Sequence, residues 1–374
     1  MNKIAKSVLM SSCLLILVGC GETKIGYKEN SSSEAPVALS SEVSNGFEAS
    51  SVIGFCEPKI EDYAFISIDD ETCMVTGDFT TGYENPVNVV IPTTSPDGKK
   101  VVSVGKIVGN VKTVTIPDSI TCALMENSDM ESVWLPDSVS FSFSFKNCKN
   151  LRNVHIPSDL KAIPESAFEG CTVLNQFEIP ATVKKIGSDA FAKCMAFKEI
   201  VVPSEVEKIG SGAFKGCTTL ERVQIQSNSI EISDDCFLDC INLKRINLET
   251  ATSIGVAAFK NCSSLLSVHI GRKAEVSDEA FMNCTSLIYI VFEKRAWWFY
   301  LSIGAKAFYN TNFKKIYIPK GTRFIGQEAF MTNESNAKIY CESLGWVTSW
   351  DINWYTGKIT LITGKTRAES LVED

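Results

Sequence analysis

Cysteine is the residue type in this sequence whose number and spacing first suggest chemistry. The chain has 374 residues and 14 Cys, and seven of these cysteines recur at intervals of 22 or 23 residues. The seven are Cys148, Cys171, Cys194, Cys217, Cys240, Cys262 and Cys284. Thiols can bind metals, form disulfides or act as nucleophiles, and each of these roles requires particular partners nearby.

The seven cysteines each close a copy of the same short motif, Ala-Phe-x-x-Cys. It reads "SAFEGC" at 166–171 and "GAFKGC" at 212–217, and Ser144 and Cys236 replace the Ala in two copies. Thr311 and Asn333 stand at the Cys position in the last two copies. Because small hydrogen-bonding residues replace the thiol, we interpret it as a buried structural group able to reach a turn carbonyl.

The spacing argues against disulfides and metals within this series. Side chains in register on stacked units point the same way, which is poor geometry for a disulfide. The pair Cys236 and Cys240 is already explained by the motif, so no metal site is predicted. Cys56 and Cys73 precede the repeats and could pair in an oxidising compartment. Cys122 is a candidate for the ladder position in the irregular early region.

The remaining residues do not assemble a catalytic motif. The only histidines, His155 and His269, hold the same position in separate repeats, roughly 25 Å apart by strand spacing, so they cannot share a metal. Nothing in the pattern places a nucleophile beside either one. The "TGKT" at 363–366 lacks the upstream Gly of a phosphate-binding loop. We predict no catalytic residue and no cofactor.

The elements that carry the cysteines are short strands and turns. A second pattern, Leu-x-x-Ile-x-Ile-Pro, lies between the Phe motifs, as at 151–157, 174–180 and 313–319. Its alternation predicts a strand with one buried side, which Pro closes. Ile-Gly pairs such as Ile186-Gly187 follow, where Gly permits a corner that a side chain would obstruct. A fixed period means stacked units that bury Leu, Ile, Phe and Cys in columns.

This repeat resembles the BspA-type leucine-rich repeat of bacterial surface proteins. The resemblance implies a leucine-rich-repeat solenoid, predominantly β with short turns and 3-10 pieces, and a parallel sheet on its concave face. It also implies a β-rich N-terminal cap at 52–105, the solenoid at 106–340, and a C-terminal cap at 341–374 with Trp346, Trp350 and Trp354 over the last coil. Cap strands are expected at 63–68, 73–76, 88–91 and 99–104.

The first residues resemble a lipoprotein signal peptide. Lys3 and Lys6 precede an apolar run, and Leu17-Val18-Gly19-Cys20 resembles a lipobox. This implies a signal peptide at 1–19, a lipid on Cys20, and a Ser/Glu-rich flexible tether at 20–51. The alternative is an ordinary secretory signal in which Cys20 is incidental. We expect a chain anchored to a bacterial envelope membrane by its lipid alone and exposed at the cell surface.

Charge suggests a class of partner. The net charge of −8 argues against wholesale nucleic-acid affinity. In each predicted strand, positions two, three and five, counted from the leading Leu, face solvent. Over ten strands these positions hold eight basic and four acidic residues. The basic ones are Lys112, Arg152, Lys198, Arg222, Lys244, Arg245, Lys314 and Lys315. This is either chance scatter or a footprint for an acidic protein or an anionic glycan.

Aromatic residues suggest a second feature. The interval from Phe281 to Phe308 is 27 residues, longer than the others, and its extra residues fall in "EKRAWWFYLS" at 293–302. Four consecutive aromatics cannot all face one small core, so they form either an interface anchor or a plug over a wide coil. The aromatic binding candidates are Trp134, Tyr289, Trp297, Trp298, Tyr300 and Tyr317.

Together these features favour a non-catalytic, adhesin-like surface protein. The resemblance implies that its concave face binds macromolecules of a host or of neighbouring cells. We expect a protein or anionic glycan as ligand, no nucleic acid, and a monomer. The alternative is a structural envelope lipoprotein that organises other proteins.

Overall fold

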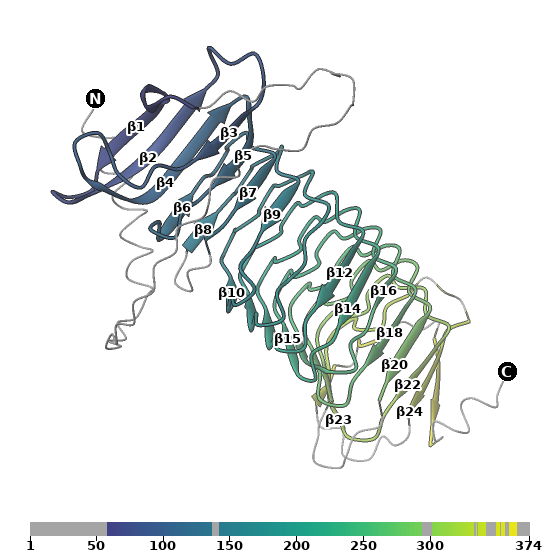
Figure 1. Ribbon diagram of the computed structural model, residues 1–374. Helices are drawn as coiled ribbons and strands as arrows, with labels where there is room; N and C mark the ends of the chain where they lie inside the picture. The colour runs from purple at the N-terminus through teal and green to yellow at the C-terminus, as the bar shows by residue number, and fades with distance from the viewer. Residues whose placement is uncertain are drawn as a thin grey trace, which may run out of the picture. The chain divides into compact units, whose positions relative to one another are not determined.

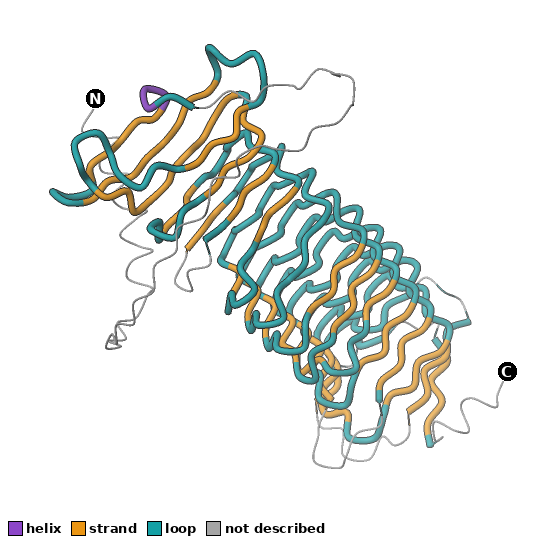
Figure 2. The backbone as a smooth tube through the Cα atoms, viewed as in Figure 1, coloured by secondary structure: helices purple, strands orange, loops and turns teal. Residues whose placement is uncertain are grey.

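A computed structural model describes residues 58–136, 142–293, 301–332, 334, 336–341, 349–351, 353–355 and 359–364. The chain divides into two compact units, Met1–Gly54 and Phe55–Asp374, and all described residues belong to the second. Apart from the short 3-10 helix η1 (Ile60–Asp62), these residues form strands, turns and loops (Figures 1 and 2). In this part of the chain, no helix has the length and apolar character needed to cross a membrane.

The unit opens with a sheet in which β1 pairs with β2, the only two described strands that run antiparallel to each other. The following strands of this sheet, β4, β6 and β8, run parallel. The strands expected at 63–68, 73–76, 88–91 and 99–104 are confirmed, with shifted ends. The observed bounds are β1 (Tyr63–Ser67), β2 (Thr72–Phe79), β3 (Val87–Val90), β4 (Lys100–Gly109), β6 (Cys122–Leu124) and β8 (Ser142–Ser144).

The Leu-x-x-Ile-x-Ile motifs form three parallel sheets in succession, β3-β5-β7-β9, β12-β14-β16 and β18-β20-β22-β24-β26. Their bounds are β5 (Val111–Thr115), β7 (Ser132–Trp134), β9 (Asn153–His155), β12 (Glu199–Val202), β14 (Arg222–Ile225), β16 (Arg245–Ile246), β18 (Ser267–Ile270), β20 (Tyr289–Phe292), β22 (Lys315–Ile318), β24 (Lys338–Cys341) and β26 (Thr360–Thr363). Successive side chains alternate between core and solvent, as period-two geometry requires. We call the solvent-facing positions of these strands the Leu-strand face.

One expected strand, at 174–180, is not formed. Phe177 stands where most neighbouring coils have Val or Ile, and its ring packs edge-on against Phe168 and Phe191 with centroids 5.0 and 4.9 Å away. The ring of Phe177 is larger than the Val or Ile side chain that this position holds in those coils. No ladder forms between β9 and β12.

A nine-stranded parallel sheet runs along another side of the coils. Its strands are β10 (Ala162–Ile163), β11 (Lys185–Ile186), β13 (Lys208–Ile209), β15 (Ile230–Ile232), β17 (Ala251–Ile254), β19 (Glu275–Val276), β21 (Leu301–Ile303), β23 (Thr322–Ile325) and β25 (Ser349–Trp350). The Gly after the strand lies against the preceding coil: a Cβ on Gly187 would sit 2.6 Å from the backbone of Pro164 and Glu165. This close approach is why the corner needs Gly.

The motif Phe rings form a stacked interior column. From Phe168 to Phe330, successive ring centroids are 5.1–5.4 Å apart and tilted by 12° or less. The Trp354 ring covers the end of the column, edge-on to Phe330 at 5.9 Å. Trp346 and the side chain of Trp350 lie outside the described residues. The predicted solenoid of parallel strands is confirmed.

Turn amides join each coil to the next one along the chain. The amide of Phe168 donates to the carbonyl of Ala190 at 2.8 Å, and the amide of Phe191 donates to that of Ala213 at 2.8 Å. At the end of the column, the amide of Phe330 donates to the carbonyl of Trp354 at 3.0 Å. Every turn therefore depends on the residues that follow it.

Candidate functional site

The structure places all seven ladder cysteines in the interior as free thiols. Each Sγ donates to a carbonyl one coil earlier; the bond from Cys194 to Phe168 and the bond from Cys217 to Phe191 are both 3.1 Å. Burial raises the pKa of the Cys148 and Cys217 thiols to about 12 and raises those of the other five as well. Since the thiolate is the reactive form, these groups are chemically quiet in the folded chain.

The early coils hold a different residue at the ladder position from the one expected. Cys122 begins β6 and is half-buried, so the suggestion that it takes the ladder position is wrong. Cys148 donates to the carbonyl of Met125 at 3.0 Å, which identifies Met125 as the Phe equivalent and buried Ser128 as the Cys equivalent. Ser128 Oγ accepts from the amide of Ile107 at 2.9 Å.

The other positions discussed with the ladder also differ from it. Thr311 donates to the carbonyl of Phe308 in its own coil at 2.8 Å rather than to the preceding coil. Cys73 is buried and free. Cys20, Cys56 and Asn333 lie outside the described residues.

At its N-terminal end, the Leu-strand face carries an aromatic pair. Trp134 is 50% exposed. The ring of Trp134 lies 4.4 Å from the ring of His155, tilted by 32°, because β7 and β9 pair these two residues directly. Arg152 is exposed beside them. Sequence reasoning singled out Trp134 and missed its stacking on His155, which needs the exact register.

In the middle of the face, basic candidates are paired with acids. Arg222 Nη1 lies 3.3 Å from Glu199 Oε2, and Lys244 Nζ lies 2.8 Å from Glu221 Oε2. The Lys244 ammonium donates to Glu221 and lowers the pKa of that carboxyl. These pairs join residues 23 positions apart in the chain. Arg245 lies next to them and is exposed.

Towards its C-terminal end, the face becomes apolar and then basic. Tyr289 is 66% exposed and Leu266 is 46% exposed. Tyr317 and Lys315 are half-buried, and Lys314 is exposed. The ladder places Ser267, Tyr289, Lys315 and Lys338 in one register column. Trp297, Trp298 and Tyr300 lie outside the described residues.

The second histidine lies between two carboxylates. His269 Nδ1 is 3.4 Å from Glu249 Oε1, and Nε2 is 3.8 Å from Glu293 Oε1. The two acids approach opposite edges of the ring, so the three groups do not converge on one point. Over the described ranges, no group of three His, Cys, Asp or Glu is placed to hold a metal ion.

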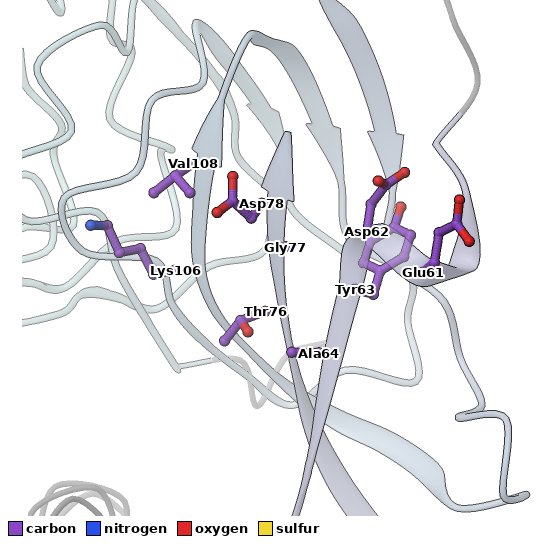
Figure 3. Close-up of a pocket in the computed structure, with 9 residues that line it drawn as sticks. All are labelled: Glu61, Asp62, Tyr63, Ala64, Thr76, Gly77, Asp78, Lys106 and Val108. Carbon is purple, nitrogen blue, oxygen red and sulfur yellow. The ribbon is translucent and has the colours of Figure 1, made fainter. Parts of the chain in front are cut away.

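A hollow of about 420 Å³ lies against the opening sheet (Figure 3). Ala64 and Thr76 line it, with Asp62, Asp78 and Lys106 among the charged residues around it. Asp62 accepts from the hydroxyl of Tyr83 and from the amide of Lys59, and Asp78 accepts from Thr80. The hollow was not predicted, because nothing in the sequence marks where a sheet leaves room.

Comparison with known families identifies the repeat. The model of the BspA type leucine rich repeat region matches residues 108–198, 138–266, 184–297 and 252–350, together more than half of the chain. The chain belongs to the BspA-type leucine-rich-repeat family. Leucine-rich-repeat solenoids generally act as scaffolds for protein interaction. No curated protein matched the chain.

Comparison with solved structures found further leucine-rich-repeat proteins to which this chain is similar. A leucine-rich repeat protein from Bacteroides ovatus is 22% identical with a TM-score of 0.46, over 81% of this chain and 77% of that one. The T. pallidum leucine rich repeat protein is 24% identical with a TM-score of 0.38, over 56% and 91%. A leucine rich cell surface protein from Faecalibacterium prausnitzii is 18% identical with a TM-score of 0.39, over 83% and 95%.

Proposed function

We propose that this chain is a non-catalytic binding protein of the bacterial cell envelope, anchored through Cys20, whose Leu-strand face binds macromolecules of a host or of neighbouring cells. The observation that carries the proposal is the exposure of large apolar side chains on that face. Trp134, Leu266 and Tyr289 are 50%, 46% and 66% exposed, on coils whose spacing is fixed by the strand ladders. Exposed aromatics on a rigid surface are typical interface anchors.

The interior thiols support a non-catalytic role. Burial raises the pKa of each ladder thiol, and each already donates to a carbonyl of the preceding coil. A nucleophilic Cys needs a thiolate and access to substrate. The ladder provides neither, so its repetition is explained by packing.

Binding is tested by incubating the purified chain with an array of extracellular-matrix proteins and glycans. A saturable ligand that is lost in a Trp134→Ala/Tyr289→Ala variant would support the proposal. Wild-type chain that retains nothing from the array, or turns over a substrate, would contradict it.

Placement on the cell is tested by protease treatment of intact bacteria. An adhesin faces outward and is degraded, whereas a periplasmic scaffold, the alternative role, is protected. Labelling with radioactive palmitate, abolished by Cys20→Ser, tests the lipid anchor.

The aromatic insertion at 293–302 has its own test. If it is an interface, Trp297→Ala/Trp298→Ala removes ligand binding and leaves the thermal midpoint nearly unchanged. A large fall in the midpoint would assign these residues to a plug over the core.

A further inference from the structure

The basic excess on the Leu-strand face lies entirely at one end. From β5 to β14 the outward positions hold four basic residues, Lys112, Arg152, Lys198 and Arg222, and four acidic ones, Glu131, Glu178, Glu199 and Glu221. From β16 to β24 the same positions, all of them described, hold five basic residues and no acidic one. The five are Lys244, Arg245, Lys314, Lys315 and Lys338. Glu221 of the preceding coil reaches Lys244, and Glu249 and Glu293 lie past the strand ends on either side of His269.

Ion pairing leaves part of this basic charge available. Lys244 is held by Glu221 of the preceding coil. Arg245 is in register with Arg222, which is itself paired with Glu199, so Arg245 faces another cation rather than an acid. Lys314 is exposed at the other side, on the coil of β22. An incoming carboxylate would find a guanidinium or an ammonium at each of these places.

Apolar side chains occupy the strands between the two basic groups. β18 and β20 separate β16 from β22, and their coils present Leu266 and Tyr289, the latter the most exposed large hydrophobic residue of those described. Figure 1 shows β16, β18, β20 and β22 side by side. At ~4.8 Å per strand, β16 and β22 are roughly 14 Å apart. The surface therefore has basic side chains on the coils of β16 and β22 and apolar side chains on the two coils between them.

We propose that the β16–β22 part of the face binds an extended acidic protein segment in which carboxylates flank large apolar side chains. This inference rests on the binding function proposed above and names its ligand class and place. An extended chain rises about 3.4 Å per residue, so roughly four residues span the two basic groups. The apolar centre favours a peptide over a sulfated glycan, since a uniformly charged polymer would lay charge over Leu266 and Tyr289 and desolvate it unpaired.

The test uses a defined probe, a fluorescein-labelled peptide Glu-Glu-Leu-Tyr-Leu-Glu-Glu, titrated with the full chain and followed by fluorescence anisotropy. Two comparison peptides replace all Glu by Gln, or the central Leu-Tyr-Leu by Gly-Ser-Gly. We expect the wild type to bind the first peptide and to bind either comparison peptide at least about tenfold more weakly. Binding should also weaken when NaCl rises from about 0.05 to about 0.3 M, because the charges are exposed.

Two variants locate the site. Arg245→Glu/Lys314→Glu should weaken binding of the acidic peptide by at least about tenfold. The control, Arg152→Glu/Lys198→Glu, makes the same charge change at exposed positions of the balanced end and should weaken it by less than about threefold, through long-range charge alone. Tyr289→Ser should also weaken binding while keeping every charge. All five positions are exposed, and thermal unfolding checks that each variant is folded.

Equal weakening by both charge variants, no effect of Tyr289→Ser, or no wild-type binding of the acidic peptide would overturn this inference. Binding of heparin in place of the peptide, lost in Arg245→Glu/Lys314→Glu, would also overturn it in favour of a glycan. The array separates this failure from that of the proposed function. If Arg245→Glu/Lys314→Glu still binds the array ligands, the proposed function holds and this inference is wrong. If the wild-type chain binds no array ligand, the proposed function is wrong.

Discussion

The regular coils from Phe145 to Phe330 and the opening coils from Val87 to Leu135 form the same kind of ladder with different interiors. The regular coils stack Phe rings and direct each buried thiol to a carbonyl one coil earlier. The opening coils place Met125 and Ser128 at the equivalent positions and otherwise fill the core with Val, Ile and Met. Parallel pairing continues through both regions, in β5-β7-β9 and in β12-β14-β16.

The difference teaches that backbone pairing defines the coil and the ring column reinforces it. A coil needs its interior volume filled and its turn groups bonded, and several side chains can do this. Regular coils gain nearly parallel, offset contact between identical rings, which adds to the free energy of burying their area. Regular coils should therefore respond more strongly to core substitutions than opening coils do.

The largest effect is expected for Phe214→Ala. The Phe214 ring is fully buried between Phe191 and Phe237, with both centroids 5.3 Å away, so its removal opens a cavity on two coils at once. We expect a loss of about 3–5 kcal/mol in the free energy of unfolding. The control, Met125→Ala in the opening coils, should cost less. Denaturant unfolding monitored by circular dichroism measures both, and a larger loss for Met125→Ala would reverse the comparison.

A smaller loss is expected at a corner glycine. In Gly187→Ala, the new methyl meets backbone atoms 2.6 Å away, so two coils must separate. We expect about 1–3 kcal/mol of destabilisation. Gly98 in the opening region has φ +86° and no atom within 4 Å of an added Cβ. Gly98→Ala therefore carries only a conformational cost of about 1–2 kcal/mol. Thermal unfolding measures both variants. A midpoint for Gly187→Ala equal to that of the wild type would show that the two coils separate without a loss of stability.

Thiol ionisation should loosen the regular coils selectively at high pH. Burial raises the pKa of Cys217 from 9.0 to about 12, so the folded chain keeps a proton that the unfolded chain releases. Its stabilising contribution is full below pH 9 and is lost as pH rises from there towards about 12. Ser128 does not titrate, so the ladder position of the opening coils lacks this dependence.

Native ladder thiols should consequently resist Ellman's reagent at about pH 8 and react once the chain is unfolded in guanidinium. Between pH 9 and 11, the free energy of unfolding of Cys217→Ser should decrease less than that of the wild type, by the contribution of one thiol. Rapid modification of all seven thiols in the native chain would show that they are accessible, against their burial.

The smallest effect is expected on the outside of the regular coils. The ion pair between Lys244 and Glu221 is half-exposed, with side chains 51% and 47% accessible. A double-mutant cycle with Lys244→Ala and Glu221→Ala should give a coupling of about 0.2–1 kcal/mol, falling with salt. A coupling free energy of the size expected for a core substitution would mean that these surface ion pairs are needed for the stability of the fold.

The repeat, its strands and the interior columns could be predicted because one period had to satisfy all copies at once. Phe214 and Cys217 recur with fixed neighbours, which leaves few places for them except the core. The sequence did not reveal that Ser128, rather than Cys122, continues the ladder, since the early intervals are shorter and the register is lost. It also did not reveal that the segment at 174–180, which contains Phe177, forms no strand.

Two further features depend on atomic register rather than on residue type. The residues before Ala190 and before Cys194, Asp189 and Lys193, both adopt left-handed backbone with φ 51° and 59°. Ser, Ala and Glu occupy the place before Ala in other coils, so no residue preference marks it. At the place before Cys, Lys193 stands where most other coils have Asn, Asp or Gly, the residues that favour this backbone. The ion pairs of Arg222 and Lys244 with the preceding coil likewise follow from pairing at a shift of 23 residues, which a periodicity near 22–23 leaves open.

The forward direction of the turn amides means that this architecture can be lengthened in its middle but not simply stopped. A duplicated coil brings both the acceptors that its predecessor requires and the donors that its successor meets. A chain cut between two coils ends instead on turn amides that have no carbonyl acceptor. The short piece at Asn353 and Trp354, which accepts from Glu328 and Phe330, therefore acts as a terminator. Gene duplication within the array is structurally permitted, whereas loss of that piece leaves a frayed last turn.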